Sequence, residues 1–202
     1  MNTPLNASAL DQLFLEARTF SSNPDPWQPR PVGEDLLRQL WDLARMGPTS
    51  SNSSPAHIVF VQTAAAKARL SPLLDDGNRP KTLAAPVTAI IGMDMKFYDQ
   101  LPKMFPHMPD ARSWFAHKSE AELLPVTLRN SSLQGAYVIL AARALGLDCG
   151  PMSGFDNAGI DAEFFAGTSI RSNFLINIGY GRRETLHPRG PRLSFEEACQ
   201  IV

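Results

Sequence analysis

The sequence predicts an α+β fold, in which helices and strands follow no regular order. The 202-residue chain is 44% hydrophobic and 19% charged, a composition typical of a globular protein with a sizeable core. Segments with helical and strand periodicity succeed one another without the alternation that builds a parallel sheet. We therefore expect one α+β domain over residues 1–202 rather than a doubly wound sheet.

The first half of the chain contains two predicted helices and two predicted strands, after a short N-terminal helix. Leucines recur at helical spacing over 34–46, and Gly47 and Pro48 follow as stop signals. The remaining elements of this half are a strand at 56–62, a helix at 64–74 and a buried strand at 85–94.

An irregular, aromatic-rich stretch comes next and spans about 95–122. Two interpretations of its aromatic rings stay open, a roof over a ligand slot or a small satellite core under a long loop. The rings concerned belong to Phe97, Phe105, Trp114 and Phe115.

The second half is predicted to hold one long helix and two strands. Residues 130–145 are apolar on nearly all faces, so this helix should be buried on most of them. Asn130 or Ser131 is its expected N-cap, and Gly146 its expected left-handed C-terminal residue. The two strands are 147–156, which breaks into a Gly/Pro turn, and the central strand 173–181, which leads into a basic segment.

The charge of the chain argues against several classes of partner. A net charge of −1 gives no electrostatic attraction to nucleic acid or to an anionic membrane. No segment approaches the roughly 18–20 apolar residues that span a bilayer. The first residues show no basic region followed by an apolar core, so no secretory signal is visible and we expect a cytoplasmic protein.

Familiar catalytic motifs are absent from the sequence. It contains no GxGxxG after a strand, no P-loop, no HExxH and no CxxC. The four histidines are scattered, so no metal site is expected, and Cys149 and Cys199 are expected to be free thiols. If the protein is an enzyme, a bound organic cofactor is therefore expected to carry the chemistry.

Arginines from distant parts of the chain suggest a phosphate site. Arg18 follows the N-terminal helix, whereas Arg189 and Arg192 lie in the basic segment near the other end. Guanidinium groups bind phosphate oxygens in pairs, although each arginine taken alone reads as a solvated surface charge. Likewise, the hydroxyl-rich loop GPTSSNSSP at 47–55 reads by itself as an ordinary polar loop after a helix.

Taken together, these loops resemble the FMN-dependent nitroreductase family. The resemblance runs from about residue 10 to residue 200 and rests on GPTSxNxSPA, ARSWF, ALGLDxGPMSGFD and LINIGYG in this order. Within the family, the pattern is similar to the branch that reduces malonic semialdehyde in the bacterial pyrimidine-utilisation pathway.

The resemblance implies a fold, an assembly and a set of cofactor ligands. It implies a mainly antiparallel sheet flanked by helices, and a homodimer with FMN at the interface. NADH or NADPH would serve as co-substrate. The residues that match cofactor-binding positions are Arg18, Thr19, Phe20, Pro48, Thr49, Ser50, Asn52, Asn78, Lys81, Asn130, Pro151, Met152, Ser153, Gly154, Arg189 and Arg192. The loop at 48–52 would reach FMN from the partner subunit, and no side chain need act as a nucleophile.

The reaction that the resemblance implies is reduction of malonic semialdehyde to 3-hydroxypropanoate. Arg112 is a candidate for holding the substrate carboxylate, and a structural ion pair with an acid such as Asp110 is the competing interpretation. Three other functions stay open: a broad nitroreductase or quinone reductase, a non-catalytic flavin-binding protein, and an interaction module without cofactor.

Overall fold

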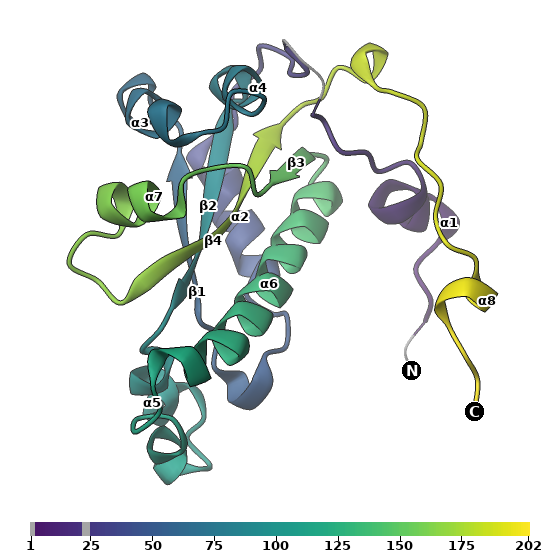
Figure 1. Cartoon of the computed structure of the whole chain (residues 1–202). Coiled ribbons are helices and arrows are strands. Elements are labelled where there is room, and N and C mark those ends of the chain that lie inside the picture. The colour runs from purple at the N-terminus through teal and green to yellow at the C-terminus, as the bar shows by residue number, and fades with distance from the viewer. Residues whose placement is uncertain (1–2, 22–24) are drawn as a thin grey trace.

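A four-stranded antiparallel sheet forms the centre of the molecule, in a computed structural model that describes residues 3–21 and 25–202 (Figure 1). The strand order is β1-β2-β4-β3, and every neighbouring pair is antiparallel. The expected antiparallel sheet is therefore confirmed. Its strands are β1 (Ala56–Val61), β2 (Val87–Asp94), β3 (Asp148–Met152) and β4 (Ile170–Gly179).

Helices cover both faces of this sheet. On one face, α2 (Glu34–Ala44) and α6 (Glu120–Ala144) enclose the main core, which includes Ala89 and Ile91 of β2. On the other face, α3 (Ala64–Leu70) and α7 (Asn157–Phe164) cover a second core around Ile90. Successive side chains of a strand point to opposite faces, so β2 feeds both cores and is buried along most of its length.

Helix α6 begins ten residues earlier than the sequence predicts. A capping box joins Ser119 and Glu122 and starts the helix at Glu120, with Pro125 inside it. Asn130 and Ser131, which we expected as caps, are buried inside the helix, so that prediction is wrong. At the other end, Gly146 adopts the expected left-handed conformation, with a φ of 75°.

The stretch before α6 forms a satellite core rather than a loose loop. It contains 3-10 turns at Phe97–Gln100 and Pro109–Trp114, and the short helix α5 (Leu101–Met104). Phe97 is fully buried and its ring lies 5.1 Å from that of Phe115. Phe97, Phe105 and Phe115 therefore belong to a satellite core, whereas Trp114 is 41% exposed. A roof over a ligand slot stays a prediction.

The remaining helices are short. Helix α4 (Arg79–Ala84) lies between α3 and β2. Helix α1 (Ala7–Leu10) continues into a π-helical turn, Asp11–Leu15, and α8 (Phe195–Ala198) lies near the C-terminus. Among the residues that the structure describes, no helix is long and apolar enough to cross a bilayer.

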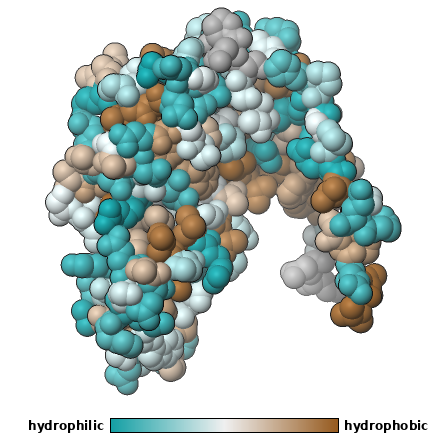
Figure 2. All heavy atoms as spheres, viewed as in Figure 1, coloured by the Kyte–Doolittle hydropathy of each residue, from teal (hydrophilic) through white to brown (hydrophobic). Residues whose placement is uncertain are grey.

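The two ends of the chain form an arm beside the sheet. The segments that carry α1 and α8 run together away from the strands (Figure 1), and Arg189 donates hydrogen bonds to the carbonyls of Leu15 and Ala17. Apolar side chains are exposed on this arm, and brown atoms mark its tip in Figure 2. The exposed apolar residues of the arm are Leu5, Leu10, Phe14, Leu15, Leu193, Phe195, Ile201 and Val202.

Candidate functional site

Four arginines line one cavity between the arm and the end of α6. The cavity has a volume of about 660 Å³ and is bordered by residues 14–21, by the last turn of α6 and by residues 186–192. Three of the arginines, Arg18, Arg189 and Arg192, are those that the sequence suggested as a phosphate cage. The fourth is Arg143 of α6. We call this cavity the arginine pocket.

The positive charge of the arginine pocket has no acidic partner. Arg18 donates to the carbonyl of His187, and Arg192 to those of Gly190 and Pro191 at 3.1 and 2.9 Å. No described acid lines the pocket or forms an ion pair with any of its four arginines. Four guanidinium groups without a counter-ion are suited to bind an anion with several oxygens.

The N-terminal segment joins this pocket to strand β3. Thr19 forms a parallel bridge with Cys149, and the Phe20 amide donates to the Cys149 carbonyl at 3.1 Å. A methyl group on Gly150 would lie 2.5 Å from the Phe20 carbonyl oxygen, so the close approach requires glycine. The Phe20 side chain is fully buried, which leaves only its backbone to face a ligand.

The turn after β3 contacts the residues around α4. Asn78 donates from Nδ2 to the Gly154 carbonyl at 2.8 Å, and Thr82 lies 3.5 Å from the Met152 sulfur. Lys81 lies on α4 as well, where partial burial lowers the pKa of its ammonium group. The contacts of Asn78 and Thr82 therefore hold the α4 region against the turn that follows β3.

Eleven of the predicted cofactor residues thus occupy one continuous region, which we call the β3 cluster. It runs from the arginine pocket along β3 to α4. Its members are Arg18, Thr19, Phe20, Asn78, Lys81, Pro151, Met152, Ser153, Gly154, Arg189 and Arg192.

The other five predicted residues form a second group, the loop cluster. The Ser50 amide donates to Asn130 Oδ1 at 2.8 Å, and the Ser54 amide to Thr49 Oγ1 at 3.0 Å. Asn52 donates from its side chain to the Met104 carbonyl at 2.6 Å. The members of the loop cluster are Pro48, Thr49, Ser50, Asn52 and Asn130.

The two clusters lie at opposite ends of the sheet. At the end of β2, the Asp94 amide donates to the carbonyl of Pro55, which comes just after the loop cluster. At the other end, Val87 begins β2 shortly after α4. The eight residues of β2 cover about 24 Å at roughly 3.4 Å per step, and Met152, which pairs with Leu175 and is therefore level with Ile90, lies about 14 Å from the Asp94 end. One protomer therefore does not bring the loop cluster to the β3 cluster.

The backbone of the loop cluster is unusual. Ser51, Asn52 and Ser54 all have positive φ, at 53°, 49° and 40°, although none is glycine. Such conformations cost free energy and persist where surrounding contacts fix them, often at binding sites. The bond from Ser50 to the buried Asn130 is one of the contacts that fix this loop.

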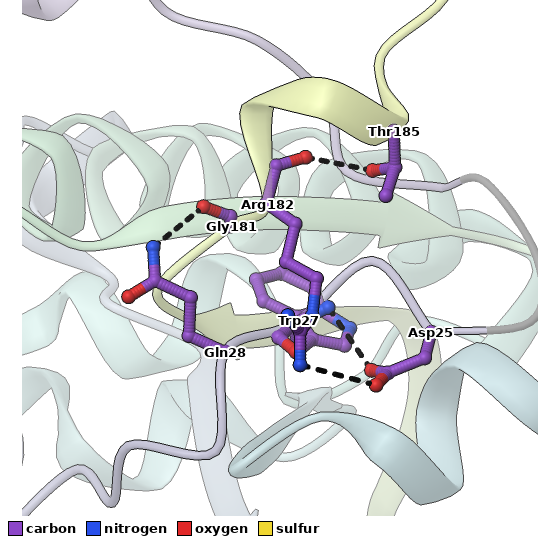
Figure 3. A network of polar contacts seen from close by, with 6 residues as sticks. All are labelled: Asp25, Trp27, Gln28, Gly181, Arg182 and Thr185. Atoms are coloured by element: carbon purple, nitrogen blue, oxygen red, sulfur yellow. Dashed lines mark hydrogen bonds and ion pairs between the residues drawn. The ribbon is translucent and has the colours of Figure 1, made fainter.

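A separate polar network joins residues 25–28 to residues 181–185, which directly precede the pocket residues 186–192 (Figure 3). Arg182 donates from Nε to the Trp27 carbonyl at 2.7 Å and forms an ion pair with Asp25 at 3.6 Å. Gln28 donates to the Gly181 carbonyl at 3.0 Å. Trp27 Nε1 in turn donates to the Lys81 carbonyl at 3.0 Å, so this network also anchors α4. Arg182 is occupied here and does not line the pocket.

Arg112 forms an ion pair, but with a different acid from the one named above. Its guanidinium contacts Asp99 at 2.8 and 2.9 Å and lies 5.7 Å from the ring centroid of Tyr98. Asp110 makes no ion pair with it. The position of Arg112 on the satellite core leaves its role toward a substrate as a prediction.

Comparison with known proteins decides the family. The model of the Nitroreductase family matches residues 26–180, most of the chain. The chain belongs to the nitroreductase family.

Relatives of this chain span its whole length. A protein of Burkholderia lata named "Putative NADH dehydrogenase/NAD(P)H nitroreductase" is 60% identical over 98% of this chain and 99% of its own. One of the same name from Stenotrophomonas maltophilia is 57% identical, with all of both chains covered.

A solved structure shows the same fold. It is that of a "putative nitroreductase in complex with FMN" from Exiguobacterium sibiricum, with a TM-score of 0.84, 18% identity and complete coverage of both chains. The predicted family and fold are therefore confirmed. The family model and these relatives do not show the malonic semialdehyde specificity.

Sequence reasoning missed Arg143 in the arginine pocket. A single arginine in the last turn of an apolar helix reads as a charge that complements the helix dipole, and it belongs to no loop motif. The available signal was its position three residues before the predicted left-handed Gly146, which implied that it lay at the same end of the sheet as β3.

Proposed function

We propose that this nitroreductase binds FMN along the β3 cluster and uses NADH or NADPH to reduce a small carbonyl acceptor. The reaction that we propose is reduction of malonic semialdehyde to 3-hydroxypropanoate. The observation that carries the cofactor assignment is the arginine pocket, whose four guanidinium groups lack an acidic partner and open toward β3.

The β3 cluster has the chemistry that FMN requires. Its arginines suit a phosphate dianion, the backbone from Pro151 to Gly154 offers a narrow turn, and Asn78 and Lys81 offer donors for polar ring edges. When bound, FMN supplies hydride transfer between a nicotinamide and an acceptor. The chain's own residues then hold the reactants at transfer distance and exclude water.

The same residues support a homodimer. Along β2 the loop cluster lies about 24 Å from the strand end beside α4 and about 14 Å from the level of Met152, a separation that favours service to the cofactor of a second copy of the chain. Helix α6 also exposes two apolar pairs on opposite flanks, Leu124 with Leu128 and Leu133 with Tyr137, and a second copy could cover such a pair. We therefore propose that each site combines the β3 cluster of one protomer with the loop cluster of its partner.

A broad NAD(P)H nitroreductase is the second candidate function. The names of the two full-length relatives favour it, because both refer to nitroreductase activity. The ion pair of Arg112 with Asp99 also favours it, because that guanidinium already has an acidic partner and is not free for a substrate carboxylate.

Absorption spectroscopy followed by kinetics tests these proposals. We expect purified protein to show a flavin spectrum that bleaches anaerobically on addition of NADH or NADPH. Values of kcat/KM are then compared for malonic semialdehyde and a nitroaromatic acceptor. A bound flavin that neither nucleotide bleaches would overturn the enzymatic function. A much larger kcat/KM for the nitro compound would assign the second candidate.

A further inference from the structure

We propose that Arg143 is a phosphate ligand and makes the site select FMN over riboflavin. This inference rests on the proposed function, because it assigns a residue to the same cofactor. Arg143 lies in the last turn of α6 and lines the arginine pocket together with Arg18, Arg189 and Arg192.

The guanidinium of Arg143 has unused hydrogen-bonding capacity. Its Nη1 donates to the Leu13 carbonyl at 3.2 Å, whereas its Nε is buried and has no partner among the described residues. A guanidinium carries five N–H donors, and buried donors in folded proteins are nearly always paired. An anion in the arginine pocket is the natural partner for the remaining donors.

Arg143 also forms no ion pair with a described acid. The residue borders a second cavity, whose lining includes Asp11, Glu16 and Asp148. It forms no ion pair with these or any other described acid, whereas Arg171 and Arg69 each pair with a glutamate. Because Arg143 forms no ion pair with these acids, its N–H donors stay available to the arginine pocket, which no described acid lines.

Arg143 differs from the other three arginines in how it is held. Arg18, Arg189 and Arg192 lie in irregular segments near the two ends of the chain, outside its helices and strands. Arg143 extends from α6, whose neighbours Ala141 and Ala142 belong to the main core. Its position is therefore fixed before a ligand binds, and a fixed cation loses little entropy when it meets a phosphate.

A purely structural role is the alternative explanation. The carbonyl of Arg143 accepts from Gln12 Nε2 at 2.7 Å and its side chain contacts Leu13, so it also fastens the N-terminal segment. The two roles differ in one measurable respect. A fastening role affects every flavin equally, whereas a phosphate ligand affects only a flavin that carries phosphate.

The test compares two flavins that differ only in the phosphate group. Dissociation constants for FMN and riboflavin are measured by fluorescence titration of reversibly stripped protein, for the wild type, R143Q and R143K. We expect R143Q to bind FMN about 10- to 100-fold more weakly, the range of one charge-assisted hydrogen bond, and to bind riboflavin as the wild type does. R143K should lie between the two.

Controls separate the possible failures. Arg45→Gln changes an exposed arginine at the end of α2 that pairs with Asp42. It should alter the affinity neither for FMN nor for riboflavin. Equal loss of FMN and riboflavin binding in R143Q, or no loss of either, would overturn the role of Arg143. If R143Q fails to fold, the same comparison of FMN and riboflavin dissociation constants is made with R143K. Failure of the wild type to bind FMN would instead overturn the proposed function itself.

Discussion

Asn130 Oδ1 accepts a hydrogen bond from the Ser50 amide at 2.8 Å, and this contact joins the buried face of α6 to the loop cluster. The same side chain donates from Nδ2 to the Val126 carbonyl at 2.8 Å, so its amide orientation is fixed from both sides. The helix thereby holds a loop in which Ser51 and Asn52 have positive φ. A rigid loop of this kind is suited to present donors to a ligand on another protomer.

Replacement of Asn130 by alanine should loosen this loop. The Ser50 amide would lose its acceptor, at a cost of about 1–3 kcal/mol in the free energy of unfolding. We also expect weaker FMN binding, because the proposed site uses this loop. Urea denaturation and flavin titration measure the two effects. Ser132→Ala, at an exposed position of the same helix, should change neither quantity much; an equal effect of both substitutions would refute the role of the contact.

Substitution of Leu128 by arginine should break the proposed dimer. Leu128 is 42% exposed on α6, one turn after the exposed Leu124. An unpaired charge buried at an interface costs several kcal/mol, so the dimer dissociation constant should rise about 100-fold or more. Sedimentation velocity over a range of concentrations measures it. Leu83→Lys alters an equally exposed leucine that lies on α4 rather than α6, and it should leave assembly intact. A wild type that sediments as a monomer would contradict the proposal.

Replacement of Gly150 by alanine should displace the N-terminal segment from β3. The new methyl group would lie 2.5 Å from the backbone oxygen of Phe20, which cannot rotate away. Overpacking of this kind costs about 1–3 kcal/mol, and it should also weaken FMN binding through Arg18. Gly33→Ala is the matched control, because nothing lies within 4 Å of the methyl group added there. Its cost should stay below about 1 kcal/mol. Thermal unfolding of both variants distinguishes them.

The two cysteines should differ sharply in reactivity. Burial raises the pKa of the Cys149 thiol to about 12, whereas Cys199 is exposed on the C-terminal segment. The thiolate is the reactive form, so native protein at pH 8 should react with a disulfide reagent at Cys199 alone. Cys199→Ser should therefore be unreactive until denaturant is added. Rapid reaction of that variant in the native state would contradict the burial of Cys149.

The shifted pKa of Cys149 also predicts a pH dependence of stability. Above the ordinary value of 9.0 the unfolded chain loses this proton, whereas the folded protein keeps it until about pH 12. In that window the unfolded state binds fewer protons, so the free energy of unfolding falls as pH rises, by up to about 1.4 kcal/mol per unit. The stability difference between wild type and Cys149→Ala should shrink accordingly between pH 8 and 10. Urea titrations at both values measure it, and a constant difference would refute the shift.

The sequence predicted most of the sheet because buried strands have a simple signature. The apolar runs at 56–62, 85–94 and 173–181 match β1, β2 and β4 closely, since few polar residues interrupt them. Helix α6 was predicted too short, because residues 120–129 mix acids, proline and leucines without a clear apolar face. Its start is set by one local capping box at Ser119.

The candidate site was predictable only in part. Motif resemblance selected residues that the fold gathers beside β3, such as Asn78 and Gly154, which are 76 positions apart in the chain and in contact. It could not select Arg143, whose relevance depends on which cavity the last turn of α6 borders. The distance between the two clusters was also invisible, since it depends on the direction in which β2 crosses the sheet.

The placement of the two clusters at opposite ends of the sheet has a genetic consequence. In the proposed dimer, one chain defective only at Arg18 and another defective only at Asn52 would each form inactive homodimers. A mixed dimer of the two would pair an intact β3 cluster with an intact loop cluster at one site and combine both defects at the other. Co-expression of two inactive alleles should therefore restore activity, which is interallelic complementation.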